Sequence, residues 1–302
     1  MPLPFRQDSK KQASIASSSL SELLACGHFQ AAAVLAADLL KSEPDPTNHV
    51  RIFSLLYTRL ACLQLLGLEY EAAQEAKALQ DLSAPFYRNR GKHVVPWELR
   101  ILAIRLHAVG FGDWRRGIMG YYDLAREARF EFQRAPIEQR NEWQDRLYDL
   151  GVRVSNALIE VGDLDGALHH LESLPAEAHK HHLLQTRLVL TSLRCGNVEA
   201  ARRLCTSEDG EADKTQRTLL ALCNMAEGSF EEAAALWGDL EKTGPDDERA
   251  LATQNLALCH VYLGDIIKVG ELNKAGVVER AKISRLESSS TDWSTNMVTC
   301  MQ

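Results

Sequence analysis

The chain has 302 residues, of which 45% are hydrophobic and 25% charged, and its formal net charge is −7. This acidic balance argues against a general polyanion-binding protein, because phosphate contacts need a surplus of Lys and Arg on one face. No run approaches the roughly 20 apolar residues of a membrane span. The first residues, MPLPFRQDSKKQ, carry charges where a signal peptide needs an apolar core, so we do not expect secretion. Seven cysteines without a CxxC pair are typical of reduced thiols and favour a cytosolic location.

The start of the chain differs in composition from the rest. Residues 1–18 are polar, small and Ser-rich, and we interpret them as a flexible leader. From about Leu20 onward, Leu, Ala, Glu and Arg dominate, and apolar residues recur at spacings of three and four. No convincing run of alternating β-branched residues lies between turn signals. The sequence therefore predicts an all-α protein.

The helical segments repeat around a glycine. We take one glycine of each repeat as its origin for counting: Gly27, Gly67, Gly112, Gly162, Gly196, Gly228 and Gly264. A small or slim residue follows five places later in each repeat: Ala32, Ala72, Gly117, Ala167, Ala201, Ala233 and Val269. The last four origins are 34, 32 and 36 residues apart, close to the period of about 34 residues of tetratricopeptide repeats.

Each repeat has the features of a helical hairpin. The glycine can end the first helix in the left-handed conformation, and a capping residue for the second helix follows in the last four repeats, at Asp163, Asn197, Ser229 and Asp265. Pro44 and Pro245 stand where a second helix should end. One hairpin cannot bury its own apolar face, so the hairpins must stack. We predict a tetratricopeptide-like α-solenoid of about seven hairpins over residues 19–275, followed by a divergent, loosely ordered tail at 276–302.

Two segments interrupt the regular spacing. Residues 80–96 predict a long loop between the second and third hairpins. Residues 113–161 predict an extended hairpin, with helices from about Trp114 to Arg134 and from Glu138 to Val161 separated by Pro136. Both are longer than a standard repeat allows.

Motifs for chemistry are weak throughout. The Gly-rich stretch GFGDWRRG at 110–117 follows a predicted helix and lacks phosphate-loop spacing, so we interpret it as a hairpin turn. Five histidines gather in the sequence as a possible zinc site or a solvated turn between repeats: His169, His170, His179, His181 and His182. There is no HExxH or GxSxG. We therefore expect no catalytic residue, cofactor or metal, although a metal-dependent enzyme built on the histidines stays open to metal analysis.

The 80–102 region is the best candidate for a partner-binding site. Cationic and aromatic residues surround the sequence VVPW, and Arg and Trp supply much of the binding energy at interfaces. The candidate residues are Tyr87, Arg88, Arg90, Lys92, Trp97 and Arg100. The alternative is an ordinary surface loop with Trp97 tucked beneath it.

A carboxylate clamp of the kind found in chaperone-binding tetratricopeptide adaptors is not expected. The column that carries the clamp's Asn, six residues before the glycine, reads Leu190, Leu222 and Leu258. This weakens the alternative of a generic tetratricopeptide adaptor, such as a chaperone cofactor.

The order of segments resembles the trafficking protein particle (TRAPP) complex subunit 12 family. The matching stretches are LLACGHFQAAAVLAADLL, IFSLLYTRLACLQLLGLEYEAAQEA, GKHVVPWELRIL at Gly91 to Leu102, and GSFEEAAALWGDL, within roughly Leu20 to Asp265. The family usually has a long region ahead of the repeats and further hairpins after them, whereas here a short leader precedes the repeats and the match decays after Asp265.

The resemblance implies a non-catalytic scaffold subunit of a membrane-tethering complex. That complex as a whole acts as a nucleotide exchange factor for a Rab-family GTPase in endoplasmic reticulum to Golgi transport and autophagy. The implied partners are other TRAPP subunits, with the GTPase reached only indirectly and no nucleic acid. The implied location is cytoplasmic, peripheral to endoplasmic reticulum–Golgi membranes through the complex.

Overall fold

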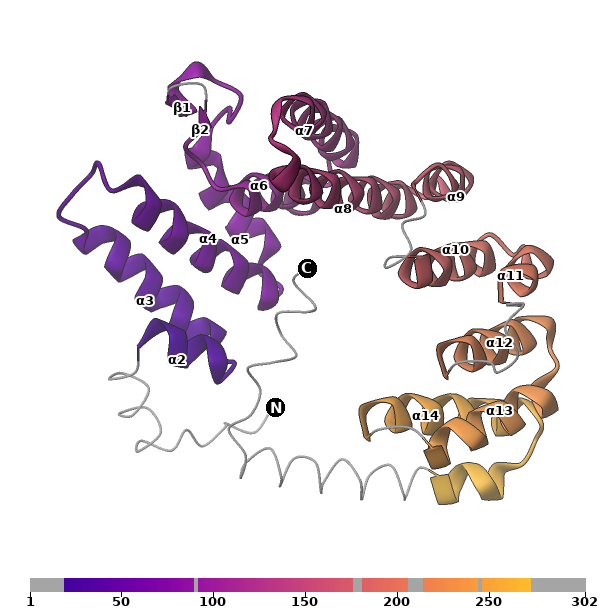
Figure 1. Cartoon of the computed structure of the whole chain (residues 1–302). Helices are drawn as coiled ribbons and strands as arrows, with labels where there is room; N and C mark the ends of the chain where they lie inside the picture. The colour runs from indigo at the N-terminus through magenta and orange to yellow at the C-terminus, as the bar shows by residue number, and fades with distance from the viewer. Residues whose placement is uncertain (1–18, 90–91, 176–180, 206–213, 244–245, 273–302) are drawn as a thin grey trace, which may run out of the picture. The chain divides into compact units, whose positions relative to one another are not determined.

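A computed structural model of the chain describes residues 19–89, 92–175, 181–205, 214–243 and 246–272 (Figure 1). These residues fall into two compact units. Unit 1 extends to Glu127, and unit 2 begins at Ala128. The predicted leader at 1–18 and the predicted tail at 276–302 lie outside the described residues.

Unit 1 consists of short and medium helices with one small β-hairpin. In chain order its elements are α2 (Leu20–Ala25), α3 (Phe29–Ser42), α4 (His49–Leu65), α5 (Glu69–Ala76), the 3-10 turns η1 (Lys77–Leu79) and η2 (Pro85–Tyr87), β1 (Arg88–Asn89), β2 (Lys92–His93) and α6 (Trp97–Phe111). The next helix, α7 (Trp114–Arg134), contains the boundary between the two units.

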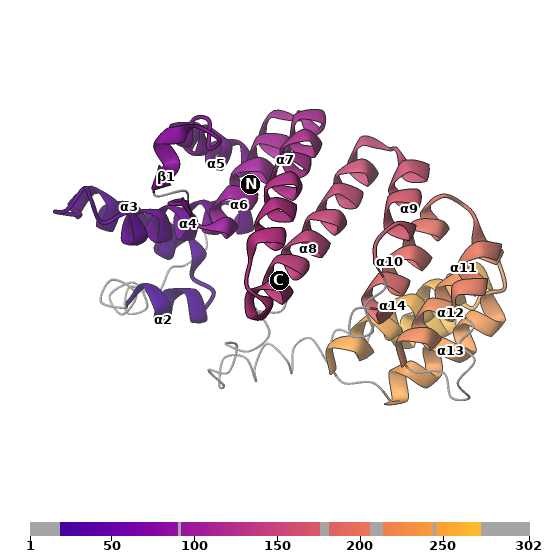
Figure 2. The same ribbon diagram turned by 45° about the horizontal axis from the view of Figure 1, so that its top comes forward.

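Unit 2 is entirely helical within the described ranges. Its elements after α7 are α8 (Ile137–Val161), α9 (Leu164–Glu172), α10 (His181–Arg194), α11 (Val198–Cys205), α12 (Lys214–Glu227), α13 (Phe230–Thr243) and α14 (Asp246–Tyr262). A further helical segment covers residues 266–272. Figures 1 and 2 agree that α10 to α14 pack in chain order. The prediction of an all-α tetratricopeptide-like fold is confirmed.

The repeat glycines are the hairpin turns. All seven predicted origins have φ between 67° and 88°. At the C-cap of α8, for example, Gly162 has φ 88°, and its N–H donates to the carbonyl oxygens of Leu158 and Ile159. A side chain at such an angle clashes with the backbone, so Gly ends the helix at least cost.

Most of the predicted caps are formed as well. Asp163 and Asn197 accept hydrogen bonds from the N–H groups of Gly166 and Ala200, at 3.0 and 3.1 Å. Asp265 accepts from the Lys268 N–H at 3.5 Å. These bonds satisfy orphan donors at the first turn of each second helix.

The core is a series of clusters, each built from three consecutive helices. One joins α10, α11 and α12 around Val189, Ala201 and Cys223. The next joins α12, α13 and α14 around Trp237 and Cys259. In unit 1, α4, α5 and α6 share a cluster of the same type. In these three clusters, a hairpin buries its apolar face against the first helix of the next hairpin, as predicted for stacked repeats.

Small residues bring the paired helices close together. Ser155 on α8 is fully buried and donates a hydrogen bond from Oγ to the Ala167 carbonyl on α9, at 3.2 Å. Ala201 and Ala233, which hold the same position as Ala167 in their hairpins, are also fully buried. The small side chains five residues after each glycine are thus packing residues.

The structure describes most of both segments that were predicted to interrupt the regular spacing. Helix α7 ends before Pro136, and α8 begins directly after it. The predicted loop contains β1 and β2, an antiparallel pair in which Arg88 faces His93 and Asn89 faces Lys92. Strands of two residues are too short to show an alternating pattern, so the sequence did not reveal them. None of the helices in the described ranges combines the length and apolar character that a membrane crossing needs.

Candidate partner-binding loop

The 80–96 loop starts at a strained residue. Gln80, directly after η1, has φ 52° and ψ −139°, and it is the one non-glycine residue of the described chain with positive φ. Such a conformation costs about 1–3 kcal/mol and persists only where the surroundings fix it. The loop is therefore held by its other contacts.

Tyr87 anchors the middle of the loop to the body of unit 1. Its hydroxyl donates to the Leu79 carbonyl at 2.6 Å, and its carbonyl accepts the Val94 N–H at 2.8 Å. Its ring stacks on His93, with centroids 6.1 Å apart and an interplanar angle of 6°. Tyr87 is thus a structural residue of the loop, with its polar end bonded inward.

His93 is held as a neutral imidazole. Its Nδ1 accepts the Val95 N–H at 3.1 Å, so the proton lies on Nε2, which donates to the Leu82 carbonyl at 2.8 Å. Burial lowers the pKa of His93, and the nearby charge of Arg100 lowers it further. The ring therefore joins both sides of the loop without carrying charge at neutral pH.

A buried ion pair lies beneath the loop. Arg100 on α6 donates to both carboxylate oxygens of Glu127 on α7, at 3.1 and 2.6 Å. Arg88 donates to the same carboxylate at 3.4 Å. Burial raises the pKa of Glu127, but the hydrogen bonds and charge of Arg100, with the charge of Arg88, outweigh it and hold this pKa below its ordinary value. The pair fixes the start of α6 against α7.

Several predicted contact residues are buried by these interactions. Trp97 and Arg100 are only 8% and 6% exposed, with the Arg100 guanidinium carbon 5.3 Å from the centre of the Trp97 ring. Neither residue therefore presents much of its side chain to solvent in this structure. Arg90 lies outside the described residues, as does the side chain of Lys92.

The exposed part of the loop is Phe86 together with Arg88. Phe86 is 85% exposed and touches Tyr87 edge to face, with ring centroids 5.2 Å apart. Arg88 keeps an exposed side chain despite its bond to Glu127. An exposed aromatic ring beside a cation, on a rigidly anchored support, is suited to protein recognition.

Two residues of this region, Phe86 and Glu127, were not predicted from the sequence. Pro85 at the start of a short turn is a local signal for the outward placement of Phe86, since the turn separates it from the inward-facing Tyr87. Glu127 has no such signal, because it lies 27 residues from Arg100 and its pairing depends on how α6 and α7 pack.

A second exposed feature occurs in unit 2. The leucines six residues before the glycines, Leu190 and Leu258, are exposed, and Leu222 between them is half-buried. They lie on the first helices of three consecutive hairpins, α10, α12 and α14. This column holds no amide or cation that could bind a carboxylate.

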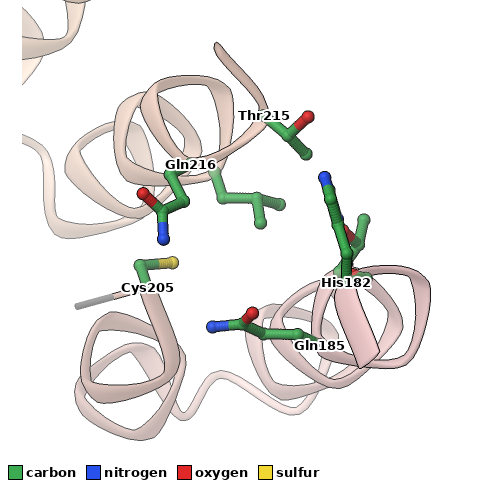
Figure 3. Close-up of a pocket in the computed structure, with 7 residues that line it drawn as sticks. His182, Gln185, Cys205, Thr215 and Gln216 are labelled. Carbon is green, nitrogen blue, oxygen red and sulfur yellow. The ribbon is translucent and has the colours of Figure 1, made fainter. Parts of the chain in front are cut away.

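A small cavity lies among α10, α11 and α12 (Figure 3). Its volume is about 140 Å³, below the several hundred Å³ typical of small-molecule sites. Its lining consists of His182, Gln185, Thr186, Cys205, Thr215, Gln216 and Leu219. Burial raises the pKa of the Cys205 thiol to about 12. The thiol therefore stays protonated, which makes it a poor nucleophile.

The histidine cluster is only partly described. His169 is exposed and lies 3.7 Å from the Glu172 carboxylate, whereas His179 and the side chain of His181 fall outside the described residues. Within the described part of the chain, no three His, Cys, Asp or Glu residues are placed to hold a metal ion.

Comparisons with known proteins give a structural match only. No protein-family model matches the sequence, and no curated protein matches it significantly. Among solved structures, a crystal structure of a tetratricopeptide repeat protein from Parabacteroides merdae matches with a TM-score of 0.41 and 12% identity. That match covers 97% of this chain and 98% of the other.

Proposed function

We propose that the chain is a non-catalytic scaffold subunit of a TRAPP-type vesicle-tethering complex. The observation that carries this proposal is the order of irregular spacings in the sequence. In the sequence, the segments 80–96 and 113–161 lengthen the spacing between otherwise regular repeats, as the resemblance to the subunit 12 family implies. Its role would be cytoplasmic, at endoplasmic reticulum–Golgi membranes and in autophagy, with membrane contact only through the complex.

Interaction, rather than catalysis, suits the chemistry of the described residues. Stacked helical hairpins build extended surfaces for binding other proteins. The cavity among α10, α11 and α12 is small, and its thiol is protonated. We therefore propose no enzymatic activity, and we assign nucleotide exchange on the Rab-family GTPase to the complex as a whole.

The loop is the proposed contact with another TRAPP subunit. Phe86 offers an aromatic anchor that is already ordered by Tyr87 and Pro85, so little conformational entropy is lost on binding. Arg88 adds a cation whose side chain is 41% exposed. Aromatic and Arg side chains are the commonest hot spots of interfaces.

The proposal can be tested by affinity purification of the tagged full chain from native lysate. We expect the wild type to recover other TRAPP subunits, and Phe86→Ala with Arg88→Glu to recover fewer. The matched control is Ile137→Ala with Arg203→Glu in unit 2. It changes an apolar residue about as exposed as Phe86 and an Arg more exposed than Arg88. Failure of the wild type to recover any TRAPP subunit would remove the assignment to this complex. Equal recovery by the loop variant would remove only the loop as the contact.

The generic adaptor is the second candidate. It is favoured if the wild type recovers other proteins but no TRAPP subunit. A chaperone cofactor that grips C-terminal carboxylates is disfavoured by the leucines at the clamp position, Leu190, Leu222 and Leu258. Binding of acidic C-terminal peptides by the full chain would reverse that judgement.

A further inference from the structure

Exposed apolar residues are unevenly distributed among the helices of unit 2. Within its described part, the second helices α9, α11 and α13 carry no exposed large hydrophobic residue, whereas the helical segment 266–272 exposes Ile266 and Ile267. The first helices α10 and α14 carry several, with leucines between 41% and 62% exposed. Scattered exposed leucines need no explanation, but leucines that recur at the same position of successive hairpins mark a surface with a role.

Five leucines form this surface, and their register places them on one face. We define the leucine ladder as Leu183, Leu190, Leu222, Leu251 and Leu258. Leu190, Leu222 and Leu258 stand six residues before the turn glycines of their hairpins, and Leu183 and Leu251 stand seven residues earlier still. Residues seven apart lie on the same side of an α-helix, two turns from each other.

The ladder is separate from the hydrophobic core. The core uses other positions of the same helices, including Val189 on α10, Ala221 on α12 and Leu256 on α14, all buried. Leu222 connects the two, because it packs against the cluster of α12, α13 and α14 while keeping part of its surface open. The four exposed ladder leucines therefore add little to the packing of the unit, whereas Leu222 contributes to it.

Two cations without an acidic partner flank the ladder on α10. On α10, Arg187 and Arg194 alternate with Leu183 and Leu190 along one stripe. Arg187 reaches only the side-chain oxygen of Asn156, at 3.5 Å, and Arg194 makes no ion pair with any described residue. By contrast, Arg202, on a second helix, is paired with Glu227 at 2.5 Å. On α10, the ladder thus joins apolar side chains with unneutralised positive charge.

The spacing of the ladder fits a helical ligand better than an extended one. Leucines seven residues apart on one helix are separated by about 10.5 Å, and packed helices lie about 8–10 Å apart. A bound helix repeats its apolar face at i and i+7, also about 10.5 Å apart. Side chains on one face of an extended strand recur about every 6.6–6.8 Å, which does not match the spacing of the leucines.

We propose that the leucine ladder binds an acidic amphipathic α-helix of a partner protein. This inference rests on the proposed scaffold function and specifies the chemistry of one partner. The partner helix carries leucine-like residues at i, i+3 or i+4, and i+7. Asp or Glu residues beside them pair with Arg187 and Arg194. The terminal segments of the chain itself, 1–18 and 273–302, contain more Lys and Arg than Asp and Glu. Their charge therefore makes them poor occupants of this surface.

The test uses the full chain and three fluorescent synthetic helical peptides with the same apolar residues. One peptide is flanked by Glu, one by Lys, and one has the Glu sequence scrambled. Fluorescence anisotropy should show the Glu peptide binding at least about tenfold more tightly than the other two, and weakening as salt is added. Equal binding of the Glu and Lys peptides, or no binding of the Glu peptide, overturns the proposal.

Two variants locate the binding on the ladder. Leu190→Ser with Leu258→Ser should weaken binding of the Glu peptide about tenfold or more, whereas the control Val50→Ser, at an exposed site in unit 1, should not. Arg187→Glu with Arg194→Glu should reverse the preference toward the Lys peptide. All these side chains are exposed, so circular dichroism should confirm that each variant folds. Unchanged binding by a folded leucine variant overturns the proposal.

The measurement also separates this inference from the proposed function. If the wild type recovers TRAPP subunits but binds no acidic helix, the ladder proposal fails and the scaffold assignment stands. If the Glu peptide binds but no TRAPP subunit is recovered, the ladder binds an acidic helix and the assignment to the TRAPP complex fails. Light scattering adds one more outcome: a wild-type dimer that the leucine variant turns into a monomer identifies a second copy as the occupant and overturns the proposal.

Discussion

The two units of the chain use the same helical hairpin in different ways. Unit 1 interrupts its hairpins with a loop held by directional polar contacts, including Tyr87 to Leu79 and Arg100 to Glu127. Unit 2 repeats its hairpins from α10 to α14 with small residues at each close approach, such as Ala201 and Ala233. The first arrangement fixes one exposed aromatic residue, and the second produces the same exposed position repeatedly.

This difference shows how a repeat protein can obtain two kinds of surface. A regular array copies any outward residue along its length, so Leu190, Leu222 and Leu258 form a column without further support. An irregular loop needs its own anchors, because a loop without them loses order. Substitutions can therefore be aimed at either the regular packing or the special anchors, and the two should respond differently.

The largest effect is expected for Trp237→Ala in unit 2. Trp237 is among the largest fully buried side chains of the described chain, and its Nε1–H donates to the sulfur of Met225 at 3.2 Å. Its loss should lower the free energy of unfolding by about 3–5 kcal/mol, because the stacked hairpins cannot close the cavity. Hydrogen exchange with mass spectrometry should show faster exchange in α12, α13 and α14.

The control for this variant is Phe86→Ala, which removes an exposed ring from unit 1. Its effect on unfolding should stay within about 0.5 kcal/mol. If Trp237→Ala accelerated exchange in α4, α5 and α6 as strongly as in α12, α13 and α14, the stabilising clusters would not be local.

Removal of the ionic anchor should have the next largest effect. Arg100→Met leaves the largely buried Glu127 carboxylate without its main partner, and should cost about 3 kcal/mol at neutral pH. Arg126→Met breaks an exposed ion pair with Asp123 on the same helix, and should cost less than about 1 kcal/mol. Urea denaturation of both variants measures the difference.

The cost of Arg100→Met should depend on pH in one direction. The pKa of Glu127 is lowered in the folded protein, so its contribution to stability is present above the ordinary Glu pKa of about 4.3. That contribution is lost as the pH falls through the lowered folded pKa. The gap between wild type and variant should therefore shrink in acid. A gap that stays constant from neutral pH to about pH 3 would show that Glu127 is not the cause.

The smallest effects should come from a pair of glycine substitutions with opposite signs. A Cβ at Gly110 on α6 would lie 2.4 Å from the Cβ of Ala73 and 2.8 Å from the Glu69 carbonyl oxygen, so Gly110→Ala should destabilise unit 1 by about 1–3 kcal/mol. Gly238 on α13 has no neighbour within 4 Å, and Gly238→Ala should stabilise the helix by about 0.5–1 kcal/mol. Thermal denaturation that moved both variants in the same direction would contradict the packing of α6 on α5.

Much of the fold could be predicted because the signals are local. A glycine at a helix end requires a left-handed backbone angle, and a capping residue directly after it starts the next helix. Both signals lie within a few residues of each other, as at Gly162 with Asp163 and Gly196 with Asn197. Pro136 likewise predicts the break between α7 and α8.

The candidate site was harder to predict because its contacts are distant in sequence. A cluster of cations and aromatic residues suggests an interface, but burial decides which side chains face outward. Arg100 is turned inward by Glu127, and Trp97 is buried, whereas Phe86 is exposed. None of these outcomes follows from composition, since each depends on how α6, α7 and the loop pack together.

The three-helix clusters have a consequence for how unit 2 unfolds. Neighbouring clusters share a single helix: α12 contributes Cys223 to one cluster and Ala221 to the next. Contacts in such an array join segments that are close in sequence, so the contact order is low. Low contact order favours rapid folding. Unfolding of a hairpin on one side of α12 therefore removes only the α12 contacts in that cluster. The cluster on the other side of α12 stays intact. Unit 2 should open in graded steps along its length, and the shared helix α12 should be the last to exchange its amide protons.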